Sequence, residues 1–369
     1  MPLNETIIVE AVQRYWREYD RYLKLAKRIE EICRADVVEG NAIRGQVTFR
    51  AKDPKRFEGK LRKYLGEPEE VASLNTVDDV FLRVGDFAGV RIATYEERDR
   101  QSIVDAIKKT FIGKEGNEVE VDIKDCTEKF YRATHCQVYL PEEELIGTYE
   151  NLKGLGCEIQ VSSMLAHVWN EVEHDLRYKP QMGDPADREN ELLTELGHLL
   201  HAGDTVIKHL LEETEKRHRT DTEPFVDVFD FVTRMREYLS SIRDLGQRAG
   251  QVFEELIAQG LNTPKVFKEQ FIGVEDIGAA KEELTRFSDW LATNEDTGWD
   301  LGIDNSDVLL VHLLSKRLDQ VIVRHPLGKG KGRPSRLVSL AIRFKKYREG
   351  GQSEGQGSGS QVPSAGGTQ

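Results

Sequence analysis

The spacing of apolar residues changes between helical and strand periods along the first part of the chain. From Thr6 to Ala35 apolar residues recur in steps of three and four, which predicts a long amphipathic helix with Trp16 and Tyr19 on its apolar face. From Asn41 to Lys52 apolar and polar residues alternate, as in a half-buried strand. A helix should then run from Asp53-Pro54 to about Leu65, because aspartate caps a helix well and proline fits the first turn.

The same interleaving continues as far as residue 179. Strands are predicted at 87–95, 118–123, 130–140 and 156–161, and helices at 97–111 and 162–178. Strands that alternate with helices favour a sheet with helices packed on it. We therefore predict an α+β fold with a mixed β-sheet of about five strands flanked by helices.

After Pro180 the pattern contains no convincing strand. Helices are predicted at 187–218, 226–259, 264–271, 278–293 and 306–323. The last stretch is rich in Gly, Ser and Gln, a composition that cannot bury enough apolar surface to fold. The predicted organisation is an α/β domain with its N-terminal helix at 1–221, a mainly α-helical accessory domain at 222–348, and a disordered tail at 349–369.

Composition narrows the classes of function. The 369 residues carry a net charge of -13, which argues against a general nucleic-acid coat. No apolar run approaches the roughly 20 residues that span a bilayer, so no membrane association is expected. The four cysteines form no paired or zinc-type spacing, which favours free thiols and a cytoplasmic location.

Cations nevertheless cluster in one segment of this acidic chain. Residues 44–63 form a basic strand that leads into a basic helix, and they include Arg50, Lys52 and Lys60. A helix N-terminus with free N–H groups and nearby cations suits a polyphosphate.

Two acidic residues lie at predicted strands. Asp86 comes just before one buried strand, with Arg91 inside it, and Glu158 lies on a later strand with Gln160 on the same face. A carboxylate on an inner strand face is costly unless it is paired or holds a metal, so Glu158 is a suitable partner for Asp86.

An aromatic residue and two histidines complete the candidate site. Tyr131 and His135 share one face of the predicted strand at 130–140, where they could stack on a base and contact a phosphate. His167 lies on the helix that follows Glu158.

The order of these segments resembles the synthetase domain of the RelA/SpoT family. RAKDPKRFEGKL, DFAGVRI, FYRATH and EIQVSSMLAHVWNEVEHDLRYK follow one another over about 140 residues. The resemblance implies a nucleotidyltransferase-like synthetase similar to the small alarmone synthetases. It would transfer the β,γ-pyrophosphate of ATP to the 3′-hydroxyl of GDP or GTP, with Mg²⁺ as cofactor.

The resemblance also implies a role for each matching residue. The ATP-binding cations are Arg50, Lys52, Lys60 and Arg91, with the two arginines stacked on the adenine. Asp86 and Glu158 are implied as the catalytic acids and Mg²⁺ ligands, Glu158 acting on the metal or as the base. The acceptor residues are Tyr131, His135, Gln160 and His167.

The acceptor side departs from the family pattern, so the acceptor stays open among GDP, GTP, an adenine nucleotide and tRNA. Phe130 and Ala133 stand where the family commonly has Gly and Ser, and Ser162-Ser163 where it has Arg-Thr. One alternative function is toxic pyrophosphorylation of tRNA 3′ ends, for which the basic segment 324–348 is a further motive. The other is a non-catalytic regulatory binding module.

The spacing within 222–348 selects no single role. Homo-oligomerisation, self-neutralisation of a toxic synthetase and the sensing of a regulatory partner are all compatible with a helical accessory domain.

Overall fold

The structure is a computed structural model that describes residues 3–126, 130–177, 185–215, 220–294, 299–325 and 335–354. It divides into two compact units, residues 1–218 and residues 219–369.

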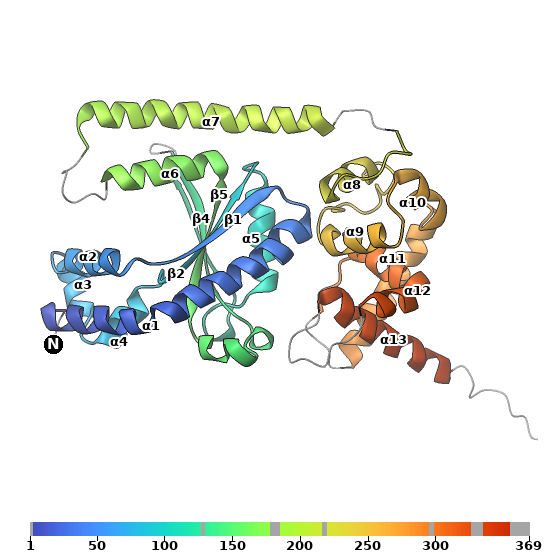
Figure 1. Cartoon of the computed structure of the whole chain (residues 1–369), viewed down its shortest axis with the longest axis horizontal. Helices are drawn as coiled ribbons and strands as arrows, with labels where there is room; N and C mark the ends of the chain where they lie inside the picture. The colour runs from blue at the N-terminus through green and yellow to red at the C-terminus, as the bar shows by residue number, and fades with distance from the viewer. Residues whose placement is uncertain are drawn as a thin grey trace, which may run out of the picture. The chain divides into compact units, whose positions relative to one another are not determined.

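The first unit is built on a five-stranded sheet with the order β1-β2-β5-β4-β3 (Figure 1). Strands β2 and β5 are parallel, and the other neighbouring pairs are antiparallel. The prediction of a mixed sheet of about five strands flanked by helices is therefore confirmed. The strands are β1 (Gly45–Ala51), β2 (Ala88–Thr94), β3 (Glu120–Cys126), β4 (Tyr131–Tyr139) and β5 (Gly156–Ser163).

Seven α-helices belong to the described part of this unit. Helix α2 begins as predicted, because the Asp53 side chain accepts hydrogen bonds from the backbone N–H groups of Lys55 and Arg56. Helices α3 and α4 were not predicted, although Thr76 and Asp79 form a capping box at the start of α4. The helices are α1 (Glu5–Ile32), α2 (Pro54–Tyr64), α3 (Pro68–Ser73), α4 (Val77–Arg83), α5 (Asp99–Thr110), α6 (Met164–Arg177) and α7 (Asp187–Glu215).

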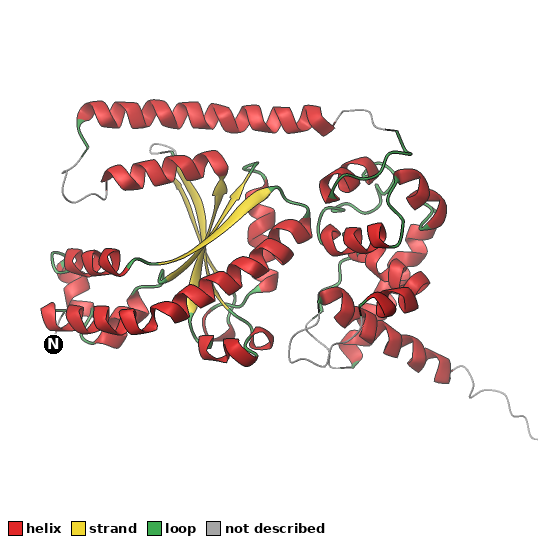
Figure 2. Ribbon diagram, in the orientation of Figure 1, coloured by secondary structure: helices red, strands yellow, loops and turns green. Residues whose placement is uncertain are grey.

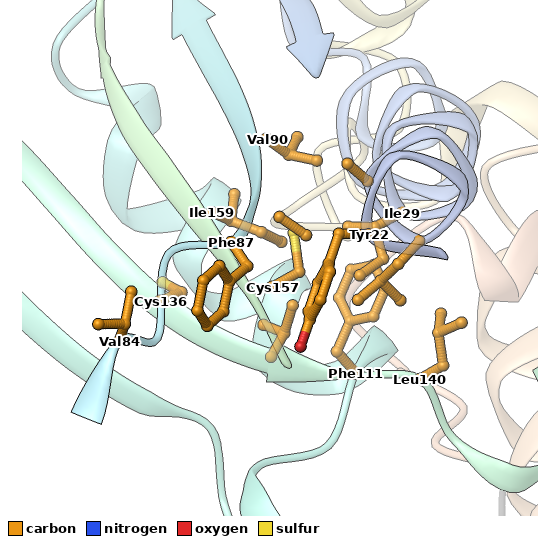
Figure 3. Packing of buried hydrophobic residues seen from close by; sticks show 14 of the residues in the cluster. Tyr22, Ile29, Val84, Phe87, Val90, Phe111, Cys136, Leu140, Cys157 and Ile159 are labelled. Carbon is orange, nitrogen blue, oxygen red and sulfur yellow. The ribbon is translucent and has the colours of Figure 1, made fainter. Parts of the chain in front are cut away.

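The core lies between helix α1 and one face of the sheet. Tyr22 and Ile29 of α1 pack toward Val90, Cys157 and Ile159 of the strands (Figure 3). All five side chains are buried, which fixes α1 across β1, β2 and β5.

The predicted apolar face of the first helix was wrong in one respect. Tyr15 is fully buried, whereas Trp16 is 59% exposed. Adjacent residues on a helix point about 100° apart, so only one of two neighbouring aromatics can face the sheet.

Helix α6 covers the opposite face of the sheet. The Asn170 side chain donates to the Arg132 carbonyl at 3.3 Å, and Glu171 pairs with Arg91 of β2 at 2.6 Å. Helix α7 packs in turn on α6, where the Trp169 indole donates to the Leu193 carbonyl at 3.1 Å. This face of the sheet is the one that carries the polar residues of the candidate site.

The second unit is helical, and Figure 2 shows no strand in its described part. Its core is aromatic, with Phe231, Phe267, Phe287 and Phe344 fully buried. The prediction of a mainly α-helical C-terminal region is confirmed. The helices are α8 (Val228–Met235), α9 (Ala249–Ala258), α10 (Pro264–Gln270), α11 (Asp276–Thr293), α12 (Asp307–Arg324) and α13 (Arg336–Glu354).

Two expectations for this region differ from the structure. A single helix at 226–259 was wrong, because turns separate α8 from α9 and Arg248 adopts a left-handed conformation with φ 63°. Helix α13 continues to Glu354, into the segment predicted to be disordered, and residues 355–369 lie outside the described ranges. Of the basic segment 324–348, residues 326–334 also lie outside them.

None of the described helices combines the length and the apolar character that crossing a bilayer requires. Cys33, Cys136 and Cys157 are buried free thiols.

Candidate active site

The register of the sheet brings predicted residues from four strands onto one face. Arg91 of β2 and His135 of β4 both stand opposite Gln160 of β5, and Arg50 of β1 stands opposite Gly89. Residues opposite each other share a face, and Glu158 joins them because it is two residues from Gln160. The predicted common face of Glu158 and Gln160 and that of Tyr131 and His135 agree with this register.

A sheet face covered by a helix normally buries apolar side chains, and here it carries charged and polar ones instead. The other face of β5 has the usual composition, with Cys157, Ile159 and Val161 fully buried. Glu158 and His135 keep only 23% and 11% of their side chains exposed. Partly buried charge of this kind requires partners or a ligand.

Asp86 is held between two lysines at the edge of this face. Its carboxylate pairs with the ammonium of Lys52 and lies 3.4 Å from that of Lys60. Lys52 follows β1, Lys60 projects from α2, and Asp86 precedes β2, so three separate elements meet here. The structure thus brings two of the four predicted cations together with the predicted metal ligand.

The pKa values of this cluster show that it favours the ionised carboxylate. Burial alone would raise the pKa of Asp86, but the charges of Lys52 and Lys60 bring it below the ordinary value. Burial lowers the pKa of Lys52 despite the neighbouring Asp86. For Lys60 burial also acts to lower the pKa, but Asp86 outweighs it and the pKa is raised.

A hydrogen-bonded chain of side chains surrounds Glu158. Gln160 donates to one carboxylate oxygen at 2.6 Å, and Nδ1 of His135 lies 3.1 Å from the other. Because a carboxylate only accepts hydrogen bonds, Nδ1 carries a proton. In the neutral ring Nε2 then accepts from the Tyr131 hydroxyl, 3.1 Å away.

This chain keeps Glu158 ionised. Burial would raise its pKa, and the nearby charge of Asp86 acts in the same direction, but the bond from His135 and that from Gln160 lower it on balance. The pKa of Tyr131 is raised by burial and by Glu158, so the phenol remains a donor. An anionic acceptor therefore stands beside a neutral aromatic side chain.

The two carboxylates fit a magnesium ion only with help from a substrate. Within the described ranges no group of three or more His, Cys, Asp or Glu side chains could hold a metal ion. Asp86 and Glu158 are oxygen donors close enough for the charge of one to affect the pKa of the other. Mg²⁺ commonly takes one or two protein carboxylates and completes its shell with phosphates and water, and this donor set suits it.

The two arginines on the polar face differ in their surroundings. Arg50 is exposed, whereas Arg91 is 21% exposed and pairs with Glu171 of α6 at 2.6 Å. His167 lies one turn before Glu171 on α6, and its pKa is lowered by burial and by the charge of Arg91. Glu171 was not predicted, although its four-residue spacing from His167 is a signal for a shared helix face.

Cavities in the described part of the first unit include two with volumes above 500 Å³. One of about 550 Å³ is bounded by Glu97, Arg100 and Asp204 and contains none of the predicted site residues. The other, of about 510 Å³, is bounded by residues that include Gly85, Phe87 and Tyr139, and Asp86 is not among them. The predicted site residues lie outside both of these cavities.

The sequence of this region matches a known family. Residues 50–183 match the family described as "Region found in RelA / SpoT proteins". The matched segment includes every predicted site residue, from Arg50 to His167. The predicted resemblance is confirmed for this part of the chain.

Solved structures similar to this chain include two bacterial proteins. The small alarmone synthetase 1 from Bacillus subtilis is 20% identical, with a TM-score of 0.42, over 55% of this chain and 99% of that one. A GTP pyrophosphokinase family protein from Streptococcus pneumoniae is 20% identical, with a TM-score of 0.41, over 54% of this chain and 94% of that one. No curated protein matches the sequence.

Proposed function

We propose that the RelA/SpoT-type region at residues 50–183 transfers the β,γ-pyrophosphate of ATP to the 3′-hydroxyl of GDP or GTP. The observation that carries the proposal is a single polar sheet face on which cations surround one carboxylate, Asp86, and a hydrogen-bonded chain holds a second, Glu158. Phosphoryl transfer needs little else from a protein than positioning and neutralisation of charge.

The donor side is formed by the four cations. Lys52 and Lys60 would exchange their pairing with Asp86 for the phosphates of ATP, because a polyphosphate offers them more negative charge than one carboxylate. Arg50 and Arg91 would hold the adenine between their guanidinium planes, with Glu171 fixing Arg91 in place.

Asp86, freed from the lysines, would hold Mg²⁺ together with the phosphates, with Glu158 as the second acid. The ion, when bound, supplies neutralisation of the charge on the transferring group. Asp86 and Glu158 suit a shared ion because the charge of Asp86 is near enough to Glu158 to affect its pKa.

The acceptor side is formed by the chain around Glu158. Tyr131 would stack on the base, and Gln160 and His167 would line the acceptor site. As the alternative to metal binding, Glu158 would take the proton of the attacking hydroxyl, since its pKa is lowered and His135 stabilises its charge. A Glu158→Gln variant distinguishes a base from a metal ligand, because only loss of a metal ligand should weaken binding of Mg²⁺ with a nucleotide.

The test is transfer of label by the full chain in the presence of Mg²⁺. ATP labelled in its γ-phosphate is offered GDP, GTP, an adenine nucleotide or tRNA in separate reactions. We expect label on GDP or GTP, and loss of transfer in Asp86→Asn. The matched control is Asp78→Asn, which makes the same change at a side chain that is 81% exposed.

Three outcomes would contradict the proposal in different ways. Label on tRNA alone would support pyrophosphorylation of tRNA 3′ ends. Label on an adenine nucleotide alone would keep the chemistry and change the acceptor. No transfer to any acceptor would favour a non-catalytic binding module.

A further inference from the structure

One fully buried tyrosine of helix α1 contacts the backbone of two segments that carry the lysine–aspartate cluster, which consists of Lys52, Lys60 and Asp86. The Tyr15 hydroxyl donates to the carbonyl of Lys52 at 2.7 Å. It also lies 3.5 Å from the carbonyl of Phe87, the residue that follows Asp86. The Phe87 carbonyl already accepts the N–H of Lys52 at 2.9 Å, so the hydroxyl closes a small hydrogen-bonded ring where β1 ends and β2 begins.

The ring of Tyr15 reaches the third segment of the cluster. Its centroid is 4.8 Å from that of Phe87 and 5.2 Å from that of Phe57. Phe57 is fully buried on α2, one turn before Lys60. One side chain therefore contacts each of the segments that carry Lys52, Lys60 and Asp86.

We propose that Tyr15 is a positioning residue that sets the separation of Lys52, Lys60 and Asp86 for binding of the ATP phosphates and the metal. The proposal rests on the function proposed above. It assigns to α1, which lies outside the matched segment 50–183, a direct part in the geometry of the site.

The hydroxyl, and not only the ring, is needed for this role. A Phe at position 15 would keep the aromatic packing but leave the Lys52 carbonyl without its side-chain partner. Burial raises the pKa of Tyr15, so the hydroxyl remains a donor throughout the neutral range.

The test compares Tyr15→Phe with Tyr22→Phe in the full chain. Tyr22 is a matched control, since it is a buried tyrosine of the same helix and its ring lies 5.6 Å from Tyr15 and 5.0 Å from Phe87. No hydrogen bond joins its hydroxyl to Lys52 or Asp86 in the described structure. Wild type, both variants and Asp86→Asn are titrated with Mg²⁺ and α,β-methylene-ATP, whose bridging carbon prevents pyrophosphate transfer.

In Tyr15→Phe we expect affinity for the Mg²⁺–analogue complex to fall about tenfold, with a higher Mg²⁺ concentration needed for half-saturation. Tyr22→Phe should stay within about twofold of wild type. A purely structural role would lower the melting temperature of Tyr15→Phe while leaving the affinity of the folded protein unchanged, and that result would overturn the inference.

Failure of the positioning role and failure of the proposed function give different results in this experiment. If wild type binds the analogue, Asp86→Asn does not, and Tyr15→Phe matches wild type, the positioning role is wrong and the proposed function stands. If wild type itself does not bind the analogue with Mg²⁺, the proposed function is rejected and the role of Tyr15 is rejected with it.

Discussion

Replacing Asp86 with asparagine should destabilise the first unit as well as stop transfer. The change keeps the size of the side chain and removes the charge that faces Lys52 and Lys60. Because the pKa of Asp86 is lowered on balance, its surroundings favour the charged form, and its removal costs stability.

The size of this loss in the free energy of unfolding follows from how exposed the three paired side chains are. Side-chain exposure is 16% for Lys52, 27% for Asp86 and 35% for Lys60. The Lys52 pair therefore lies between an exposed ion pair, worth about 0.2–1 kcal/mol, and a buried one, whose breakage costs about 3–5 kcal/mol. The more exposed Lys60 adds only a few tenths of a kcal/mol. We expect a loss of about 2 kcal/mol, which corresponds to about 4–8 °C in Tm for a unit of this size.

The dependence on pH has a definite sign. A carboxylate with a lowered pKa stabilises the fold above its unfolded pKa, near the ordinary value of 3.8, and the stabilisation is lost as pH falls through the lower folded pKa. The difference between wild type and Asp86→Asn should therefore be full at pH 7 and should close as the pH falls below 3.8.

The assay is thermal unfolding of the full chain followed by tryptophan fluorescence. Replacing Trp290 and Trp299 with Phe leaves Trp16 and Trp169, which both lie in the first unit. Asp78→Asn is the control, because its carboxylate is 81% exposed and should contribute less than about 1 kcal/mol. Equal Tm values for wild type and Asp86→Asn at pH 7, or a difference that does not change with pH, would refute the reasoning.

Three further substitutions, with Gly278→Ala as a control for one of them, test other parts of the structure. If Glu158 is the base, Glu158→Gln should lower kcat at least about 100-fold and leave the affinity for the Mg²⁺–analogue complex unchanged. If Glu158 binds the metal, the same variant should lower that affinity. A rate within tenfold of wild type would contradict both roles. Gly197→Ala should cost about 1–3 kcal/mol in thermal unfolding, since the new Cβ would lie 2.4 Å from the Phe130 ring. Gly278→Ala, with no atom within 4 Å, should not destabilise, and similar Tm shifts for the two would show that the contact with Phe130 is unimportant. Asp307→Asn should lower the free energy of unfolding by about 3 kcal/mol, because the fully buried carboxylate pairs with Arg248 at 2.6 Å and with Arg336 at 2.7 Å. The measurement is urea unfolding followed at Trp290, and an unchanged midpoint would be inconsistent with this role.

Local periodicity was sufficient to predict which candidate residues share a face. The two-residue period of a strand placed Glu158 with Gln160, and Tyr131 with His135, on common faces. It could not show that β2 and β5 are neighbours, and that pairing is what brings Arg91 opposite Gln160. Sheet order depends on contacts between distant segments, which periodicity does not contain.

Contacts between elements were the part that the sequence did not reveal. Glu171 pairs with an arginine from β2, and the Tyr15 hydroxyl bonds to backbone carbonyls of two other segments. Every residue has a backbone carbonyl, so residue types do not indicate which carbonyl a side chain bonds to. The contacts of Tyr15 could therefore only be seen in the structure. The break between α8 and α9 was missed because apolar residues in it, such as Leu239 and Ile242, recur at nearly helical spacing. They lie in turns, and their side chains are buried.

The central claim is that the reaction moves a pyrophosphate as one group, and the fate of the phosphorus atoms of ATP tests it most directly. The full chain is incubated with Mg²⁺, GDP and ATP labelled separately in the β- and γ-phosphates, and the products are separated. The proposed function predicts one AMP released for each acceptor modified, with both labels on the acceptor. ADP as the nucleotide product, with only the γ-label transferred or released as free phosphate, would contradict it.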